Sequence, residues 1–202
     1  MVRDQRAPDV PRELTSRRPR RLGWWAGATL AATLAMSFLT GLLGHATVTS
    51  PSMAPTHDVG STLLTTSLGA RHPDRGEVVV FEAPRSWREA HRARSGAAGD
   101  EVGAQDAMVK RVLGLPGDRI TCCAPGGALM RNGRVLDEPY LAEPPIDVSN
   151  VAYDVTVPPG HLWVLGDNRR RSFDSRAMQA RGGQTGLLPL TAVRARVLRG
   201  WP

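Results

Sequence analysis

The sequence contains a single lysine. Of its 26 basic residues, 25 are Arg and the remaining one is Lys110. Both residue types serve as solvated surface charge, but an Arg guanidinium stays protonated in proteins, whereas a Lys amine loses its proton when burial lowers its pKa. The one basic position that departs from Arg is therefore a candidate for acid–base chemistry.

Cysteine and clustered metal ligands are also scarce. Two Cys exclude a disulfide-dense scaffold, and they are neighbours, Cys122 and Cys123. Neighbouring Cα atoms about 3.8 Å apart lie below the usual disulfide range, so we expect two thiols, with a strained disulfide between these neighbours as the alternative. The five His are scattered without metal-ligand spacing, and no Gly-rich phosphate loop is present. The sequence predicts no metal site and no cofactor.

Excess positive charge is concentrated at the N-terminus. Residues 1–22 hold seven Arg and three acidic residues, which is more than half of the formal net charge of +7. Such a Pro- and Arg-rich composition cannot bury a core and predicts a disordered, basic cytoplasmic tail. Because little excess charge is left for the rest of the chain, we expect no nucleic-acid partner.

A charge-free apolar segment follows the tail. Residues 23–44 would form a helix about 33 Å long, which is enough to cross the core of a lipid bilayer. Trp24 and Trp25 lie where an interfacial belt is expected, and the preceding Arg residues predict a cytoplasmic N-terminus. We expect a single-pass transmembrane signal anchor in the cell membrane, with residues 45–202 extracytoplasmic. The alternatives are a cleaved signal, with residues 44–46 at the cleavage site, twin-arginine export and a buried core helix. The length of the apolar run favours the anchor over a cleaved signal, and the seven Arg before an all-apolar helix favour it over a core helix.

Residues 45–202 carry short apolar and β-branched runs between Gly and Pro. This pattern predicts one mainly β domain. Asn132–Gly133 predicts a type I′ hairpin turn. Residues 86–106 lack a strand pattern and predict a surface insertion. The predicted strands are 77–81, 108–113, 119–122, 155–157, 161–165 and 192–198.

Ser52 is a candidate nucleophile. It lies between Pro51 and Pro55, which restrict the backbone around it. It follows Gly44 by eight residues, so chemistry at Ser52 would take place within about 26 Å of the membrane surface. A Ser hydroxyl is a weak nucleophile unless a neighbouring base takes its proton. A rigid juxtamembrane turn without chemistry is the alternative interpretation.

Lys110 is the candidate base. Strand alternation places it on the same face as Met108 and Val112. If that face is the core, the pKa of Lys110 falls from about 10.4 and a neutral amine becomes available. A lysine that extends along an edge strand into water is the alternative.

Residues 166–176, GDNRRRSFDSR, form a third cluster. Asp174 and Arg176 are two residues apart and can form an ion pair, and the Ser172 hydroxyl can orient a nearby amine. A solvated basic loop is the alternative.

Four motifs in this order resemble the type I signal peptidases of bacteria, which are membrane-anchored proteases with a serine–lysine dyad. They are PSMAPT at 51–56, RGEVVVF at 75–81, VKRVLGLPGD at 109–118 and GDNRRRSFDSR at 166–176. The resemblance implies a β domain of the signal peptidase type, with Ser52 as nucleophile and Lys110 as general base.

The resemblance also assigns supporting residues. Ser172 matches the serine that orients the lysine, and Asp174 and Arg176 match a supporting salt bridge. The oxyanion hole would use the backbone N–H of Ser52, with the Ser50 hydroxyl as a second donor.

The implied substrates are signal peptides of preproteins, cleaved after the small residue of an A-x-A pattern through an acyl-enzyme, and the implied second partner is the lipid bilayer. We expect Val48, Met53 and Val109 to line shallow substrate pockets. Two other functions remain open. One is a Ser–His hydrolase that uses His57 or His161, and the other is a membrane-tethered β domain that binds a partner without catalysis.

Overall fold

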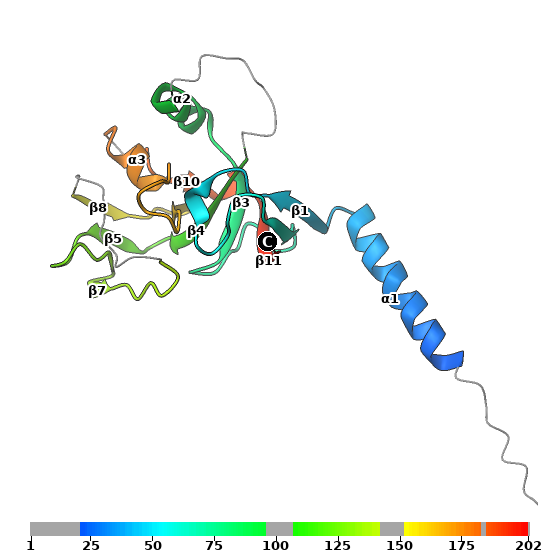
Figure 1. Ribbon diagram of the computed structural model, residues 1–202. Helices are drawn as coiled ribbons and strands as arrows, with labels where there is room; N and C mark the ends of the chain where they lie inside the picture. The colour runs from blue at the N-terminus through cyan, green and yellow to red at the C-terminus, as the bar shows by residue number, and fades with distance from the viewer. Residues whose placement is uncertain (1–20, 96–106, 142–151, 183–184, 202) are drawn as a thin grey trace, which may run out of the picture. The chain divides into compact units, whose positions relative to one another are not determined.

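The computed structural model describes residues 21–95, 107–141, 152–182 and 185–201 (Figure 1). Its contacts divide the chain into two units, Met1–Ser37 and Phe38–Pro202. Apart from its last two residues, the predicted N-terminal tail lies outside the described part. The same holds for residues 96–106 of the predicted insertion.

The first unit contains most of helix α1, Arg21–Leu39. The predicted apolar span continues to Gly44, but α1 ends earlier because Gly41 takes a positive φ of 69° and Leu43 and Gly44 pair with a β-strand. Within the described residues, no helix combines the length and the apolar character needed to cross a membrane.

The second unit is mainly β, as predicted. Its short helices are α2 (Arg85–Ser95), α3 (Ser175–Gln179) and the 3₁₀ turns η1 (Pro51–Met53) and η3 (Leu190–Ala192). Its described strands are β1 (Leu43–Thr47), β2 (Thr62–Thr66), β3 (Val78–Glu82), β4 (Ala107–Gly114), β5 (Arg119–Cys122), β6 (Met130–Arg131), β7 (Arg134–Val135), β8 (Tyr153–Thr156), β9 (His161–Leu165), β10 (Leu188–Pro189) and β11 (Val193–Trp201).

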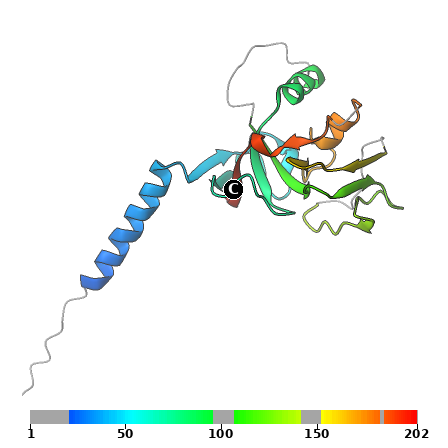
Figure 2. The same cartoon turned by 180° about the vertical axis from the view of Figure 1, so that it is seen from behind.

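The strands form two antiparallel sheets in the described part of the chain. The large sheet has the order β1-β2-β11-β3-β4-β9-β10, and the small sheet has the order β7-β6-β5-β8. Figures 1 and 2 show the small sheet beyond the β4–β9 end of the large sheet. Strands β1 and β2 lie at the opposite end of the large sheet. Strand β4 therefore lies where both sheets contribute to the core.

The predicted strand positions agree with the structure in most cases. Strands β5 and β9 coincide with the predicted runs, and the ends of β3, β4, β8 and β11 differ by one to three residues. Strand β1 was not predicted because it begins inside the apolar run assigned to the anchor. Strand β2, three of whose five residues are Thr, was also missed. The hairpin prediction is confirmed, because Asn132 (φ 53°) and Gly133 (φ 77°) join β6 to β7.

The core consists of two apolar clusters on opposite faces of β4 and β9. Val112 and Val164 belong to the first cluster, whereas Leu113 and Leu165, their neighbours in sequence, belong to the second. Since side chains alternate along a strand, β4 and β9 are buried on both faces at these positions. Lys110 shares the parity of Val112 and is thereby directed to the side of the first cluster.

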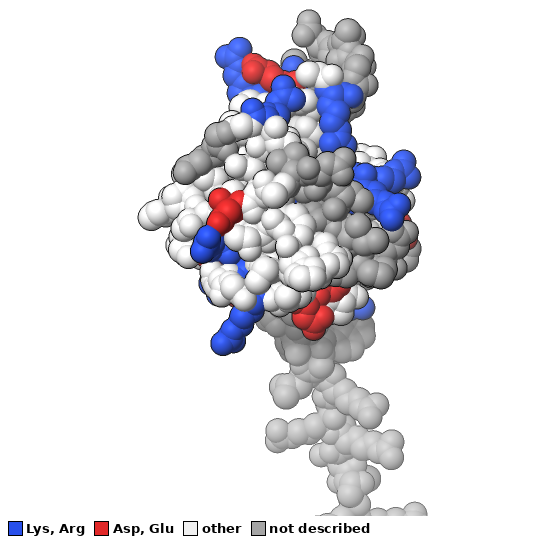
Figure 3. Space-filling view, turned by 90° about the vertical axis from the view of Figure 1, so that its left-hand side faces the viewer, with Lys and Arg blue, Asp and Glu red and all other residues white. Residues whose placement is uncertain are grey.

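Helix α2 corrects the prediction of a surface insertion over residues 86–106. The Trp87 side chain is 1% exposed and Ala90 is 4% exposed, and both belong to the first core cluster. The opposite side of α2 is strongly charged, and Figure 3 shows Arg and Glu side chains gathered over this helix at the top of the view. The polar composition concealed a helix with a narrow buried face.

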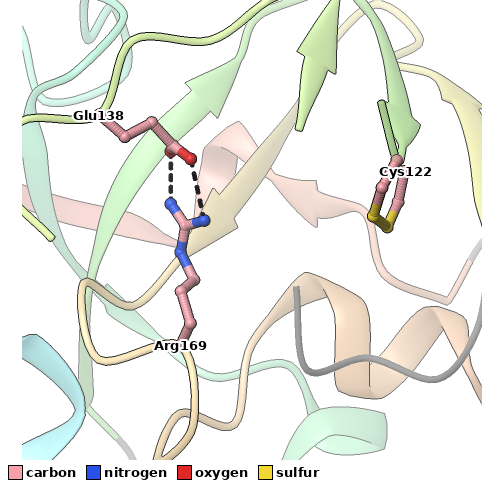
Figure 4. The surroundings of a disulfide bond; sticks show 4 residues. Cys122, Glu138 and Arg169 are labelled. Atoms are coloured by element: carbon pink, nitrogen blue, oxygen red, sulfur yellow. Dashed lines mark hydrogen bonds and ion pairs between the residues drawn. A yellow bond between two sulfur atoms is a disulfide. The ribbon is translucent and has the colours of Figure 1, made fainter. Parts of the chain in front are cut away.

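The expectation of two thiols at Cys122 and Cys123 is wrong. The two residues form a disulfide at the end of β5 (Figure 4). The expectation rested on the usual Cα separation of a disulfide, and this disulfide forms outside that range, with its Cα atoms 3.0 Å apart across a cis peptide bond.

Asp118 connects the two sheets. It accepts two hydrogen bonds from Arg75, at 2.8 and 2.9 Å, one from the Leu115 backbone at 2.9 Å and one from the Asn132 amide at 2.8 Å. Burial alone raises the pKa of Asp118, but these donors outweigh burial and lower the pKa to about 2. The ionised carboxylate therefore stabilises the junction between β4 and β5.

We predict that Asp118→Asn lowers the free energy of unfolding by about 1 kcal/mol at pH 7, a modest value because Arg75 is partly exposed. A carboxylate whose pKa is lowered by folding stabilises the protein above its unfolded pKa and loses that contribution as the pH falls. The difference between variant and wild type should therefore shrink between about pH 4 and about pH 2.

The measurement is urea unfolding of the detergent-solubilised protein across that pH range. Asp154→Asn is the matched control, because Asp154 pairs with Arg119 in the same sheet but both side chains are more than half exposed. Equal losses in the two variants would contradict a special contribution from Asp118.

Candidate active site

The candidate nucleophile lies in the 3₁₀ turn η1. Pro51 occupies the first position of this turn, where its fixed φ suits a helical start. The Ser52 carbonyl accepts a hydrogen bond from the Asn168 N–H at 3.0 Å, and the Met53 carbonyl accepts one from the His57 N–H at 2.9 Å. The bond from Asn168 attaches the turn to the loop that follows β9, and Ser52 is only 6% exposed.

Lys110 extends from β4 to the same place. Its Nζ donates to the Ser52 Oγ at 2.8 Å and to the Val109 carbonyl at 2.9 Å. The residue is 4% exposed and is flanked on its strand face by Met108, which packs against the first core cluster, and by Val112, which belongs to it. The predicted burial of Lys110 among apolar neighbours is confirmed.

The environment favours the neutral form of the Lys110 amine. Burial lowers the pKa of Lys110 to about 8, against the opposing influence of the Asp174 and Asp167 carboxylates; the Arg176 guanidinium lowers it further. At a pH near 8 a substantial part of the amine is unprotonated and able to accept the proton of the Ser52 hydroxyl. An Arg at this position would remain a cation.

The predicted Asp174–Arg176 pair is formed and buried. Arg176 donates from Nε to the Asp174 Oδ1 at 3.0 Å and from Nη2 to the Oδ2 at 2.8 Å. Asp174 also caps helix α3 by accepting from the Arg176 N–H at 3.1 Å. Burial alone raises the pKa of Asp174, but the Arg176 cation outweighs burial and lowers it, so the carboxylate stays ionised beside Lys110.

Ser172 is buried beside Gly166. A Cβ at Gly166 would overlap both the Ser172 hydroxyl and the Ser52 carbonyl oxygen, so the absence of a side chain lets these two segments approach. Among the described residues, no partner lies at the distance and angle that a hydrogen bond to the Ser172 hydroxyl requires. The hydroxyl is nevertheless close enough to Asp174 to help lower the pKa of that carboxyl group. The orientation of Lys110 by Ser172 stays a prediction.

Ser50 lies next to the nucleophile. Its backbone is extended, with φ −135° and ψ 154°, and its hydroxyl donates to the Ser52 Oγ at 3.1 Å. A donor this close to the attacking oxygen is near the place where an oxyanion would form. Its assignment as an oxyanion donor also stays a prediction.

The three residues predicted to line substrate pockets differ in exposure. Met53 is 0% and Val48 is 4% exposed, while Val109 is half-buried on β4 directly before Lys110. In this structure Val109 is therefore the one with side-chain surface available.

The two His considered as bases are not bonded to the nucleophile. His161 Nδ1 lies 3.0 Å from the Pro159 carbonyl, and His57 lies near Asp167 and Arg111. In the described part of the chain, the side chains bonded to the Ser52 hydroxyl are Lys110 and Ser50. Within the same part, no group of three or more His, Cys, Asp or Glu is arranged to hold a metal ion.

Sequence reasoning missed two ion pairs that position the loop after β9. Arg111 donates to Asp167 at 2.8 and 2.6 Å, and its guanidinium lies 4.1 Å from the centroid of the Tyr140 ring. Arg169 forms a bidentate ion pair with Glu138, and both side chains are buried (Figure 4). The position of Asp167, two residues after the end of the apolar strand β9, was the available signal.

Comparison with known proteins gives consistent relatives. The family described as "Signal peptidase, peptidase S26" matches residues 21–201. Probable signal peptidase I-2 of Synechocystis is 35% identical over 150 residues, which cover 72% of this chain and 60% of that protein. Signal peptidase I of Mycobacterium tuberculosis is 35% identical over 178 residues, covering 74% of this chain and 60% of that protein.

A solved structure is also similar. It is a signal peptidase I from Enterococcus faecalis, 28% identical, with a TM-score of 0.42, covering 63% of this chain and 97% of that one. The chain spans about 60% of the length of the two curated relatives named above. The match of the family over nearly the whole chain shows that the protein belongs to the signal peptidase family, peptidase S26.

Proposed function

We propose that the protein is a membrane-bound serine endopeptidase that removes signal peptides from exported preproteins. The observation that carries the proposal is the 2.8 Å contact between the buried Lys110 amine and the Ser52 hydroxyl. A hydroxyl and an amine of lowered pKa at this distance are the two groups that acyl transfer requires. The signal peptidases among its relatives support the substrate class.

The reaction begins when neutral Lys110 takes the proton of Ser52. The Ser52 oxygen attacks the carbonyl carbon after the small residue that ends the signal, the C–N bond breaks, and the Lys110 ammonium returns its proton to the leaving amine. The resulting acyl-enzyme is hydrolysed by a water molecule, from which Lys110 again accepts a proton. These steps need no cofactor.

The tetrahedral intermediate places a negative charge next to Ser52. We assign its stabilisation to the Ser52 backbone N–H and to the Ser50 hydroxyl, whose 3.1 Å distance to the Ser52 Oγ supports this assignment. Ser172, Asp174 and Arg176 act behind Lys110. The ion pair keeps a carboxylate beside the amine without leaving an uncompensated buried charge.

The substrate would bind as an extended segment beside β4. Small residues at the A-x-A positions suit shallow apolar pockets, for which Val48, Met53 and Val109 remain our candidates. Met53 and Val48 would need to become accessible when the substrate binds, since both are buried here.

The charge-free segment 23–44 is our candidate for the membrane anchor. The Arg-rich residues before it favour a cytoplasmic N-terminus, which would leave residues 45–202 outside the cytoplasm. With Ser52 eight residues beyond this segment, the cleavage site would lie close to the bilayer surface, where the signal peptide of a preprotein also lies.

The first prediction concerns the dyad. Ser52→Ala and Lys110→Ala should each abolish cleavage of a preprotein by the purified protein in detergent, because one removes the nucleophile and the other removes the base. Lys110→Arg should also be inactive, because Arg stays protonated. His57→Ala and His161→Ala are the matched controls and should retain activity. An active Lys110→Arg protein would rule out the general-base role.

The second prediction concerns pH. The base must be unprotonated, and burial lowers the pKa of Lys110 to about 8, so kcat/KM should rise with pH and level off above about pH 8. The measurement is the cleavage rate of a signal-peptide substrate between pH 5 and pH 10 (roughly the range that brackets this pKa). A rising limb centred near 10.4, the value of a solvated lysine, would contradict a desolvated base.

A labelling experiment distinguishes the proposed enzyme from a tethered binding domain without catalysis. A serine-directed acylating probe should modify the wild-type protein and leave Ser52→Ala unmodified. Failure to label the wild type would favour a tethered binding domain without catalysis.

A further inference from the structure

Helix α2 lies between two of the sequence motifs and has no assigned role. It follows β3 and precedes the residues before β4, the strand that carries Lys110. Its solvent side carries Arg85, Glu89 and Arg92, all exposed. Trp87 and Ala90 are its buried residues, so the helix is held to the rest of the domain by a narrow face.

Three side chains of α2 contact the Phe173 ring. The Phe173 ring lies 6.3 Å from the Trp87 ring and 5.0 Å from the His91 ring, both edge-to-face, and the Arg94 guanidinium lies 5.6 Å from its centroid. Edge-to-face aromatic pairs at these separations are favourable beyond the area they bury. Three side chains from one short helix therefore converge on a single ring, which is 7% exposed.

Phe173 is the residue between Ser172 and Asp174. Ser172 packs against Gly166 next to the nucleophile turn, and the Asp174 carboxylate accepts from the Gly166 N–H at 3.2 Å. A displacement of the Phe173 ring would therefore move the two neighbours that close the site behind Lys110. The backbone on both sides of the ring belongs to the candidate catalytic apparatus.

Trp87 links this contact to the sheet. Its indole N–H donates to the Thr185 carbonyl at 3.0 Å, and its ring lies 5.8 Å from Phe81 in an edge-to-face arrangement. Phe81 pairs with Met108 across β3 and β4, two residues before Lys110. Helix α2 thus contacts β3, the strand that pairs with the amine-bearing β4, and also the segment around Phe173.

We propose that Phe173 is a positioning residue, and that α2 is a brace which, through Trp87 and His91, holds the segment 172–174 closed against Lys110. The inference rests on the proposed serine–lysine mechanism and assigns a role in it to part of the segment first predicted to be a surface insertion. The brace acts through the lysine's environment, because the hydrogen bonds of the Ser52 hydroxyl in the described part of the chain come from Lys110 and Ser50 and not from Phe173 or α2.

Weakening the contact between α2 and Phe173 should change the pKa of Lys110 in a predictable direction. Burial is the main cause of the lowered pKa of Lys110, so water admitted behind the amine raises that pKa. The charged groups that face Lys110 are Asp174 and Arg176 from the segment before and within α3, and Asp167 from the loop after β9. From α2, His91 faces it, but burial, Arg94 and Lys110 lower the pKa of His91, so it is neutral where Lys110 titrates.

The test is the pH dependence of cleavage for variants of Phe173. Phe173→Ala removes the ring, and Phe173→Leu keeps an apolar side chain in case the Ala variant folds poorly. We expect kcat to fall and KM to stay near the wild-type value. The rising limb should shift to higher pH, with activity recovering in alkaline buffer. Each unit of increase in the pKa lowers the neutral fraction of the amine, and hence kcat at pH 7, about tenfold.

Variants of α2 test the brace itself. His91→Ala removes one ring from an exposed position without removing a charge in the relevant pH range, and should shift the limb in the same direction by less. Arg85→Ala is the matched control on the same helix, because Arg85 pairs with Glu89 at the surface and lies outside the contact with Phe173. It should leave the profile unchanged. In the Phe173→Ala background, His91→Ala should have no further effect.

The outcomes are separable. A wild-type protein that cleaves no preprotein contradicts the proposed function. An active wild type whose Phe173 and His91 variants keep the wild-type rising limb, and lose activity only in proportion to a smaller folded fraction measured by thermal unfolding, overturns the brace.

Discussion

The structure depends on keeping one amine away from water. Lys110 can accept a proton from Ser52 only while it is unprotonated, and a solvated lysine is unprotonated only in strongly alkaline solution. Burial lowers the pKa of Lys110 to about 8, yet the nearby Asp174 and Asp167 act in the opposite direction. The site therefore needs carboxylates that are already paired. Arg176 compensates Asp174, and Arg111 compensates Asp167.

Strand β4 explains how one segment delivers two basic residues to different environments. Lys110 points to the face of the first core cluster, whereas Arg111, the next residue, points to the other face and binds Asp167. In the proposed mechanism, the alternation of the strand separates a group that must lose its proton from one that must keep it. Lys110 is buried on its face, and the partly exposed Arg111 is held in place by its ion pair with Asp167.

Local sequence patterns revealed the parts of the site that depend on local geometry. Strand periodicity predicted the burial of Lys110, and the two-residue spacing predicted the Asp174–Arg176 pair. The pairs Arg111–Asp167 and Glu138–Arg169 join residues 56 and 31 positions apart, and no periodicity within one segment reports such contacts. The disulfide between Cys122 and Cys123 was missed for a different reason, because its Cα separation lies below the range that most disulfides show.

Helix α2 shows most clearly what local sequence patterns fail to predict. Eight of its eleven residues are Arg, Glu, Ser or His, and such a composition favours an exposed segment unless a buried side chain decides otherwise. Trp87 is that side chain, and its neighbour in space, Phe173, belongs to a motif that begins about eighty residues later. A motif marks the residues that perform or directly support the chemistry. The packing that holds them in place can come from the segments between motifs, so tolerance to substitution in this domain follows burial and contacts more closely than it follows membership of a motif.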